Sequence, residues 1–380
     1  MFKLTEDQKD IMELVTKFCE KEVKPLAAII DEENRFPHET VQKMVDMGLM
    51  GGFFPEEYGG AGIDYITFIM ICEELAKVCA ATSCIYSAHV GLCCWPIYNW
   101  GTEEQKQKFL KPLCEGKKLG AFALTEPSAG TDAAMQKSFA EKQPDGSYIL
   151  NGSKVFITNG GYADTVFVFA MSIKGIGTKG ITAFILEKGM PGFTVGKSEN
   201  KMGIRGSSTC ELFFDNVHIP AENVLGQEGK GFSMAMQTLD GGRCAIGAQA
   251  LGIAEGAIDE TVKYTSERVQ FGKRISQFQN TQFELADMKA NTEAAKLLVY
   301  RASLARQNGE PYSHYAAMAK LFASENASDV TRRCVQLFGG YGFTKDFPVE
   351  RMMRDAKITE IYEGTSEVQK MVISGWMGVK

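Results

Sequence analysis

The hydrophobic period of this 380-residue chain changes twice, near residue 119 and near residue 231. Apolar residues recur at helical spacing before the first point, follow a strand-like pattern between the two, and return to helical spacing afterwards. A chain of this length exceeds one ordinary domain, so separate sub-domains are expected. The sequence therefore predicts an α+β protein with a helical domain at 1–118, a β domain at 119–230 and a second helical domain at 231–380.

Helical patterns fill the first segment. An apolar face at 11–18 marks the first helix, and Pro25 is predicted to end it. The uncharged run Ser83–Trp95 predicts a buried central helix that ends at Pro96. Thr102, followed three residues later by Gln, forms a capping box that opens a further helix.

The second segment reads as strands joined by turns. Short β-branched or aromatic runs bounded by Gly, Pro, Asp or Asn predict strands at 166–170, 181–186 and 212–214, with a hairpin turn at Pro144–Ser147. In the third segment, long amphipathic or Ala-rich patterns predict helices at 247–265, 276–307 and 313–338.

Gly175–Gly180 matches the G-x-G-x-x-G dinucleotide fingerprint. That fingerprint binds pyrophosphate only where a strand feeds the N-terminus of a helix. Here a second strand follows the glycines, so we interpret them as a hairpin loop and reject a Rossmann domain.

Composition excludes several classes of function. A formal net charge of −6 argues against nucleic acid as a constitutive partner. The ten cysteines contain no C-x-x-C pair and the four histidines are isolated, so no metal site is predicted. No apolar stretch is long enough to insert into a membrane, and the acidic N-terminus resembles neither a signal peptide nor a transit segment. We therefore expect a cytoplasmic protein with reduced thiols.

Glu363 lies in the sequence Ile-Tyr-Glu-Gly-Thr-Ser near the C-terminus. Gly, Thr and Ser disfavour a helix interior, so this stretch is predicted to be a loop between helical segments. Taken alone, the local sequence favours an exposed carboxylate in a turn, with a functional side chain as the alternative.

Two sequence motifs favour the functional interpretation of Glu363 over the exposed carboxylate. Leu124–Asp132 (Leu-Thr-Glu-Pro-Ser-Ala-Gly-Thr-Asp) and Ile361–Thr365 closely resemble, in order and spacing, two motifs of the acyl-CoA dehydrogenase family of flavoproteins. The resemblance continues through Phe54–Gly60 and covers essentially the whole chain. It implies the family fold: an N-terminal α-helical domain, a middle β-sheet or barrel domain and a C-terminal four-helix-bundle domain. It also implies that Glu363 is the base that removes a proton next to a thioester.

The resemblance further implies FAD as cofactor. The residues that match flavin-binding positions are Phe122, Ala123, Leu124, Thr125, Thr131, Phe156, Ile157, Thr158, Arg268, Phe271, Gln279, Gln336, Leu337, Gly339, Gly340, Thr365, Ser366 and Glu367. Many relatives have Trp where Phe156 stands, so an indole donor is absent here. In the family the region around Arg268 reaches the FAD of a neighbouring subunit, which implies a homo-oligomer. A homotetramer built as a dimer of dimers is the favoured form, and a dimer is the alternative. An exposed surface charge is the alternative for Arg268.

Other positions are implied to bind an acyl-CoA or 2-enoyl-CoA substrate: Thr131, Asp240, Arg243, Gln249, Tyr362 and Gly364. Some relatives carry the catalytic Glu at the position of Gly242, and Gly cannot act as a base. Gln249 stands where short-chain members block the pocket floor, with a polar helix-surface residue as the alternative. Ser83 stands where glutaryl-CoA dehydrogenases place an Arg. For His89, a satisfied core histidine is favoured over a substrate contact.

The chain as a whole resembles the butyryl-CoA dehydrogenases of bacteria, which implies a bacterial cytoplasmic protein. The principal interpretation is a short-chain, butyryl-CoA-like acyl-CoA dehydrogenase that exchanges electrons with electron-transferring flavoprotein. The alternative of the same fold is a physiological reductase of crotonyl-, acryloyl- or aryl-acrylyl-CoA. A non-catalytic flavin-fold subunit is the alternative of another class. The sequence leaves open the acyl group and the direction of the reaction.

Overall fold

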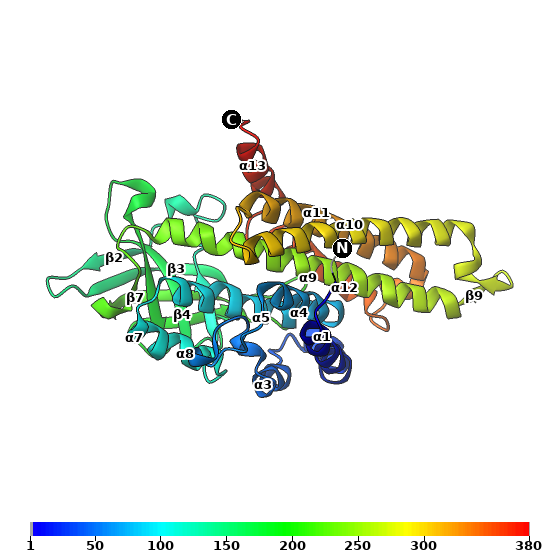
Figure 1. Cartoon of the computed structure of the whole chain (residues 1–380), viewed down its shortest axis with the longest axis horizontal. Coiled ribbons are helices and arrows are strands. Elements are labelled where there is room, and N and C mark those ends of the chain that lie inside the picture. Colours follow the sequence, from blue (N-terminus) through cyan, green and yellow to red (C-terminus); the bar gives the residue numbers. More distant parts are fainter. Residues whose placement is uncertain (1–2, 380) are drawn as a thin grey trace.

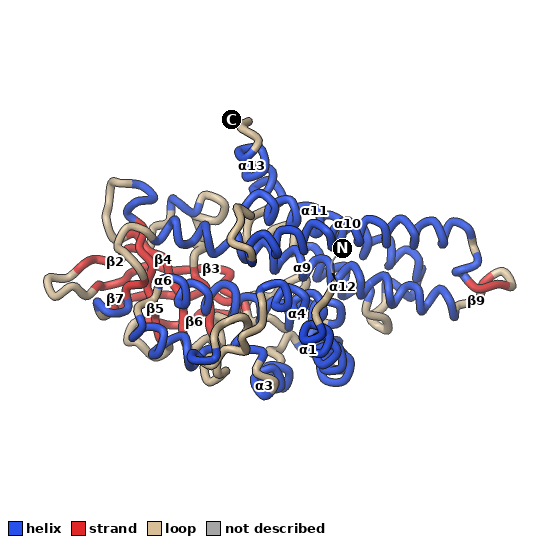
Figure 2. Tube along the Cα trace, viewed as in Figure 1, coloured by secondary structure: helices blue, strands red, loops and turns tan. Residues whose placement is uncertain are grey.

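The longest helix, α9 (Gly231–Glu267), runs from a β-sheet at one end of the molecule into a helical bundle at the other. The computed structural model describes residues 3–379, and Figure 2 shows its larger sheet gathered at one end with helices over the remainder. Helices come first in the chain, then the strands of this sheet, then helices again, so the predicted α+β class is confirmed.

Eight short or medium helices form the first part of the chain: α1 (Glu6–Phe18), α2 (Lys24–Glu33), α3 (His38–Asp46), α4 (Tyr65–Val78), α5 (Ala80–Ser87), α6 (Trp95–Trp100), α7 (Glu103–Gln105) and α8 (Lys111–Cys114). The predicted capping box is confirmed, since the Thr102 hydroxyl accepts from the Gln105 backbone N–H and the Gln105 side chain accepts from the Thr102 backbone N–H. The predicted buried central helix is also present, because every residue from Ala80 to Cys94 is buried.

The predicted helix ends at Pro25 and Pro96 are wrong. Both prolines lie inside continuous helical runs, as does Pro112. One residue separates each proline from a preceding π-helical segment: Cys19–Val23 before Pro25, Ala88–Cys94 before Pro96 and Lys106–Leu110 before Pro112. A proline lacks a backbone N–H, and its ring collides with the carbonyl four residues earlier in a regular α-helix. The wider π turn changes the hydrogen-bond register before the proline, so each helix continues.

The larger sheet comprises β1 (Gly120–Ala123), β2 (Phe139–Lys142), β3 (Tyr148–Thr158), β4 (Thr165–Met171), β5 (Ile181–Glu187), β6 (Phe193–Ser198), β7 (Thr209–Ile219) and β8 (Val224–Leu225). Its order is β6-β7-β3-β2-β4-β5-β8, and β1 pairs with β4 in parallel. The predicted strands and the turn between β2 and β3 are confirmed. Gly175–Gly180 connects the antiparallel strands β4 and β5, which confirms the hairpin interpretation and excludes the dinucleotide fingerprint.

The last part comprises α9, the hairpin β9 (Val269–Gln270) and β10 (Lys273–Arg274), α10 (Gln279–Gln307), α11 (Ser313–Phe338), α12 (Val349–Ile358) and α13 (Ser366–Trp376). α9 begins sixteen residues before its predicted start at 247. It packs tightly on α4, because a methyl group at Gly252 or Gly256 would overlap the backbone carbonyls of Glu73 or Lys77.

The hydrophobic core consists of two clusters of unequal size. The larger cluster joins the helices of both ends of the chain to one face of the sheet, and the smaller cluster lies within the sheet. We propose domain boundaries after residues 118 and 230, which lie in the connections before β1 and α9. Among residues 3–379, no helix is both long enough and apolar enough to span a membrane.

Candidate active site

Glu363 lies in the loop 359–365 that joins α12 to α13, as predicted. Its backbone is left-handed with φ of 53°, and the following Gly364 has φ of 100°. Thr365 caps α13 by accepting from the Val368 backbone N–H at 3.4 Å. The Glu363 Oε2 atom is buried and has no hydrogen-bond partner among the described residues, so the exposed-carboxylate alternative is wrong.

The Glu363 carboxylate lies against α9 at Gly242. A methyl group at that position would overlap Oε2 and approach Leu92. Burial raises the pKa of Glu363 to about 7, and the positive charges of Lys320 and Arg243 oppose that rise. A carboxylate in this environment is a base poised near neutral pH.

The buried Arg243 and the half-buried Asp240 form an ion pair on α9, one turn apart. Arg243 Nη1 donates to Asp240 Oδ1 at 2.5 Å, and Ser313 Oγ donates to the same oxygen at 2.9 Å. Burial raises the pKa of Asp240, and the nearby Arg243 charge opposes this rise. Arg243 Nε is buried without a partner among the described residues, so one donor remains available to a ligand.

Gln249 is fully buried, so the helix-surface alternative for it is wrong. Its Oε1 accepts from the Tyr362 hydroxyl, and its Nε2 donates to the Ala80 backbone carbonyl at 2.7 Å. This chain of hydrogen bonds joins the Glu363 loop to α9 and α5. Ser83 lies one turn along α5, where its hydroxyl donates to the Cys72 carbonyl at 2.7 Å.

His89 is a satisfied core histidine. Its Nδ1 accepts from the Gly120 backbone N–H at 2.9 Å, and its Nε2 lies 3.2 Å from the Leu113 carbonyl. Burial lowers its pKa to about 4, so the ring is neutral at physiological pH. The favoured interpretation of His89 is confirmed.

The middle-domain residues predicted to face the flavin are brought together at one end of the sheet. Phe122, Ala123 and Leu124 belong to β1 or follow it directly, and the Thr125 carbonyl accepts from the Val155 N–H of β3 at 2.9 Å. Phe156, next along β3, has a left-handed φ of 57° and a 65% exposed side chain. Within the same stretch Ile157 is buried and Thr158 half-buried, whereas Thr131 is exposed on the turn after β1.

A buried ion pair beneath this turn was missed in the sequence. Lys154 Nζ lies 2.8 Å from Glu126 Oε1 and also donates to the Leu124 carbonyl at 2.9 Å. Glu126 accepts from two backbone N–H groups, those of Lys137 and Ser138. The signal was a Lys within an otherwise apolar strand pattern, since a buried Lys requires a partner.

A second missed residue, Lys320, occupies the interior face of α11 and is fully buried. Its Nζ donates to the Gly364 carbonyl at 2.7 Å, immediately after Glu363. Of the residues flanking the loop, Ser366 is buried with a hydroxyl that lacks a partner among the described residues, and Glu367 is exposed.

The remaining predicted cofactor residues lie at the opposite end of the molecule, around the β9–β10 hairpin (Figure 1). The Arg268 guanidinium lies 5.3 Å from the Tyr341 ring centroid, and Phe271 is 95% exposed with φ of 51°. Gln279 begins α10 nearby. Gln336 and Leu337 lie in the last turn of α11, and Gly339 and Gly340 follow it in the short helix that contains Tyr341. One chain therefore holds two separate groups of predicted cofactor residues and does not bring them together.

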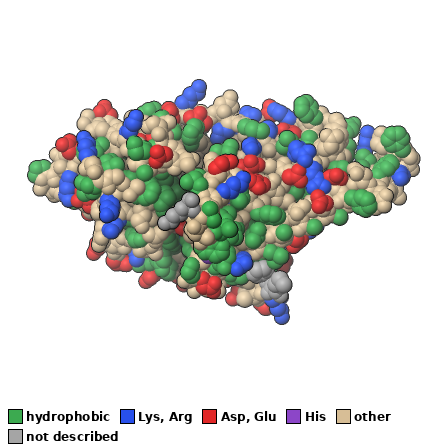
Figure 3. All heavy atoms as spheres, turned by 90° about the horizontal axis from the view of Figure 1, so that it is seen from above, with side chains coloured by type: hydrophobic (Ala, Val, Ile, Leu, Met, Phe, Trp, Pro, Cys, Tyr) green, Lys and Arg blue, Asp and Glu red, His purple; other side chains and the backbone are tan. Residues whose placement is uncertain are grey.

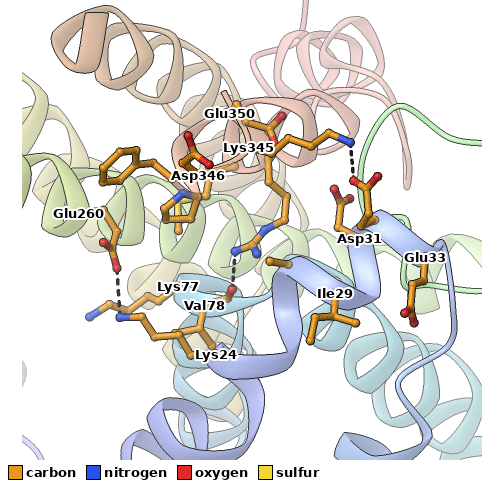
Figure 4. A pocket seen from close by; sticks show the side chains of 16 residues that line it. Lys24, Ile29, Asp31, Glu33, Lys77, Val78, Glu260, Lys345, Asp346 and Glu350 are labelled. Atoms are coloured by element: carbon orange, nitrogen blue, oxygen red, sulfur yellow. Dashed lines mark hydrogen bonds and ion pairs between the residues drawn. The ribbon is translucent and has the colours of Figure 1, made fainter. Parts of the chain in front are cut away.

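A cavity of about 670 Å³ lies between α2 and the N-terminus of α12 (Figure 4). Several charged groups on its wall already have partners: Lys24 pairs with Glu260 at 3.0 Å, Lys345 pairs with Glu32, and Arg351 donates to the Val78 carbonyl at 2.8 Å. None of its lining residues belongs to the predicted site.

Comparison with known proteins agrees with this geometry. Three family models match successive parts of the chain: the N-terminal domain of acyl-CoA dehydrogenase at residues 5–117, the middle domain at 121–217 and the C-terminal domain at 229–378. The chain is 58% identical to a short-chain specific acyl-CoA dehydrogenase of Clostridium acetobutylicum, over 98% of each chain.

Solved structures give the same result. The chain matches butyryl-CoA dehydrogenase from Megasphaera elsdenii with a TM-score of 0.97 and 53% identity, over 99% of each chain. It matches a chain from a structural study of the electron transferring flavoprotein of Acidaminococcus fermentans and flavin-based electron bifurcation with a TM-score of 0.98 and 54% identity, again over 99% of each. By sequence, domain order and fold, the chain belongs to the acyl-CoA dehydrogenase family, oxidoreductases that act on CH–CH bonds.

Proposed function

We propose that this protein is an FAD-dependent short-chain acyl-CoA dehydrogenase, with butyryl-CoA as the model substrate. The observation that carries the proposal is the buried Glu363 carboxylate, which packs on Gly242 and has no hydrogen-bond partner among the described residues. The Oε2 atom of this half-buried residue is shielded from water yet free to accept a proton. Its pKa, raised by burial to about 7, suits removal of a weakly acidic proton near neutral pH.

The loop also offers a donor for the substrate carbonyl. The Glu363 backbone N–H has no backbone acceptor among the described residues. We propose that it donates to the thioester oxygen while the carboxylate takes the proton from the adjacent carbon, since charge develops on that oxygen as the proton leaves. The unpartnered Arg243 Nε points to a further polar contact with the acyl-CoA or with the loop.

The residues present fit FAD. Phe156 exposes an aromatic face, Thr125 supplies a half-buried hydroxyl beside it, and no carboxylate of the described residues lies within 4 Å of the Arg268 guanidinium. An aromatic wall, hydroxyl donors and an unpaired guanidinium match the ring and the diphosphate. Bound FAD supplies the acceptor for the hydrogen that leaves the β-carbon. We propose that Thr125, Thr131, Phe156 and Thr158 hold its ring, and that Arg268, Phe271 and Gln279 hold its diphosphate and adenosine.

We propose that the cofactor is shared between two copies of the chain within a homotetramer. The separation of the Thr125 group from the Arg268 group supports this, because Arg268 precedes β9 at the end of the molecule away from the sheet that carries Thr125 (Figure 1). Figure 3 shows hydrophobic side chains near the middle of the face from which α13 rises. α13 and the residues after it expose Met371, Trp376, Met377 and Val379, as expected of a surface that meets another subunit.

For the electron partner we propose electron-transferring flavoprotein, and for the location the bacterial cytoplasm. Similarity to a chain solved in work on such a flavoprotein supports the first, and the bacterial origin of the relatives that are 58% and 54% identical supports the second. The Glu363 site can also act in reverse, by returning a proton to a 2-enoyl-CoA, so the assay must include both directions. A non-catalytic subunit has no use for a buried and unpartnered carboxylate.

The test is Glu363→Gln, an isosteric change that removes the base. We expect the variant to retain FAD and its oligomeric state, while anaerobic bleaching of the flavin by butyryl-CoA slows by roughly a hundredfold to ten-thousandfold or more. Reduction of crotonyl-CoA by the pre-reduced enzyme should slow in parallel. Glu310→Gln, at an exposed carboxylate, is the matched control and should behave like the wild type. Near-normal bleaching in Glu363→Gln would refute the assignment.

A further inference from the structure

Lys320 is a fully buried ammonium group whose closest hydrogen-bonding partner belongs to the Glu363 loop. Its Nζ donates to the Gly364 carbonyl at 2.7 Å, and Gln369 Nε2 donates to the same oxygen at 2.8 Å. Burying a lysine is costly, and a single neutral carbonyl compensates only part of that cost. A structural anchor for this loop needs no charge, since Gln369 already provides a neutral one.

The anchored carbonyl fixes a strained stretch of backbone. Glu363 is one of few residues other than glycine with a left-handed φ, at 53°, and such a conformation persists only where its surroundings enforce it. The Gly364 carbonyl belongs to the residue that follows Glu363. Holding this oxygen from α11 and from α13 therefore fixes the direction in which the Glu363 side chain and N–H point.

The charge of Lys320 acts on the carboxylate without pairing with it. No ion pair within 4 Å joins Glu363 to a cation among the described residues, so the carboxylate stays free to accept a proton. Burial raises the pKa of Glu363 to about 7, and Lys320 is the first charge that opposes this rise. Burial also lowers the pKa of Lys320 to about 8, and the Glu363 charge opposes that fall.

Other charged and titratable groups also face the Glu363 carboxylate and the Lys320 ammonium group. Arg243 approaches from α9, Glu360 and Glu367 flank the loop, and the thiols of Cys72 and Cys84 approach from α4 and α5. Burial raises the pKa of both thiols above their usual range, so they stay neutral through the working range of pH.

We propose that Lys320 is a positioning residue for catalysis, which orients Glu363 through the Gly364 carbonyl and whose positive charge keeps that carboxylate ionised in the absence of a direct ion pair. The proposal rests on Glu363 being the base. It predicts a bell-shaped pH dependence for the anaerobic reduction of the bound flavin by butyryl-CoA. The rate rises as Glu363 ionises near pH 7 and falls as Lys320 loses its proton near pH 8, the two limbs belonging to the coupled pair.

The experiment compares Lys320→Met with Lys320→Arg and Gln369→Met in the FAD-loaded enzyme. In Lys320→Met the alkaline limb should disappear, the acidic limb should move up by about one pH unit, and the limiting rate should fall about tenfold. Lys320→Arg keeps a charge that does not titrate, so it should lose the alkaline limb and keep the acidic limb in place. Gln369→Met removes the neutral anchor alone, so its rate should fall with both limbs unmoved.

A second readout does not depend on turnover. Infrared difference spectra against pH report the protonated carboxyl of Glu363, identified by the loss of its band in Glu363→Gln. The midpoint of that band should move to higher pH in Lys320→Met and stay in place in Gln369→Met and in Lys370→Met, a control at an exposed lysine near the loop.

Unmoved limbs of the pH–rate profile together with an unmoved infrared band in Lys320→Met would overturn the proposal. If that variant does not fold, an alkaline limb that persists in Lys320→Arg would overturn it equally. An active Glu363→Gln would instead overturn the assignment of the base, while the infrared midpoint would still report the effect of Lys320.

Discussion

At the scale of single residues, Tyr362 and Gln249 connect the Glu363 loop to the helices that face it. The Tyr362 hydroxyl donates to Gln249 Oε1, and Gln249 Nε2 donates to the Ala80 carbonyl. All polar atoms of the buried Gln249 amide thereby find partners from elements far apart in the sequence. A side chain fixed in this way is suited to limit the length of an acyl pocket.

Gln249→Gly should lengthen the acyl pocket by removing this side chain. Each additional buried methylene contributes about 0.8 kcal/mol, or about a fourfold gain in kcat/KM. Preference should therefore move from C4 toward C6 and C8 thioesters, while C4 activity falls because Tyr362 loses its acceptor. The measurement is kcat/KM for the three chain lengths in wild type and variant.

Gln237→Gly is the matched control, because it places the same substitution at an exposed position of the same helix. It should reproduce the stability cost of a helical glycine without changing chain-length preference. Unchanged C4, C6 and C8 ratios in Gln249→Gly, with C4 activity retained, would show that Gln249 does not form the pocket floor.

At the scale of elements, a buried charge network joins three helices from different parts of the chain. Lys296 of α10 lies 2.8 Å from Glu73 of α4 and 2.8 Å from Glu255 of α9, and the Tyr300 hydroxyl donates to Glu73 at 2.8 Å. Burial raises the pKa of Glu73 to about 7, and the Glu255 charge adds to this rise. The positive charge of Lys296 thus offsets part of the free-energy cost of burying the Glu73 and Glu255 carboxylates.

Lys296→Met should destabilise the protein by on the order of 3 kcal/mol, because it leaves two buried carboxylates unpaired. Glu73 has a folded-state pKa above its unfolded value, so its contribution favours folding at low pH and is lost as pH rises through about 7. The deficit in the urea unfolding midpoint should therefore be largest near pH 8 and shrink toward pH 5.

The control for this network is Lys289→Met, which removes an exposed lysine paired with Glu293 on the same helix. An exposed pair of this kind contributes little, so its urea midpoint should match the wild type at each pH. A Lys296→Met deficit that does not depend on pH would show that lost packing, rather than unpaired charge, dominates.

At the scale of the whole molecule, the predicted cofactor residues fall into two groups, one at the sheet and the Glu363 loop and the other around the β9–β10 hairpin, at the end of the molecule away from the sheet (Figure 1). We attribute this to a cofactor that bridges two subunits. Arg268→Ala should then weaken FAD retention by about tenfold or more and weaken assembly with it, because a guanidinium that binds a diphosphate across an interface contributes to both. Flavin content and sedimentation, measured together, test this.

Arg332→Ala is the control, since Arg332 is exposed on α11 and already pairs with Asp329 at 2.7 Å. It should retain FAD and assembly. A fully flavinylated Arg268→Ala oligomer of wild-type size would count against a shared cofactor site.

The sequence by itself determined the order of the elements and the kind of chemistry. The change of hydrophobic period predicted where helices give way to strands, because burying one face of each element imposes its own spacing. Gly, Thr and Ser around Glu363 predicted a loop there, and the two motifs predicted the family. Element order and the Glu363 loop depend on neighbouring residues, and the family motifs depend on which residues stand at given positions, so all three can be read from the sequence.

Only the tertiary structure decided whether the prolines end their helices and whether Glu363 is buried. Pro25 and Pro96 read as helix ends, yet a preceding π-helical segment accommodates each of them. The burial of Glu363 depends on Gly242, and its orientation and charge depend on Lys320, residues about 120 and 40 positions earlier in the chain. A pKa is set by desolvation and by charges that are close in space, so a base near neutral pH exists only once the fold has brought these three residues together.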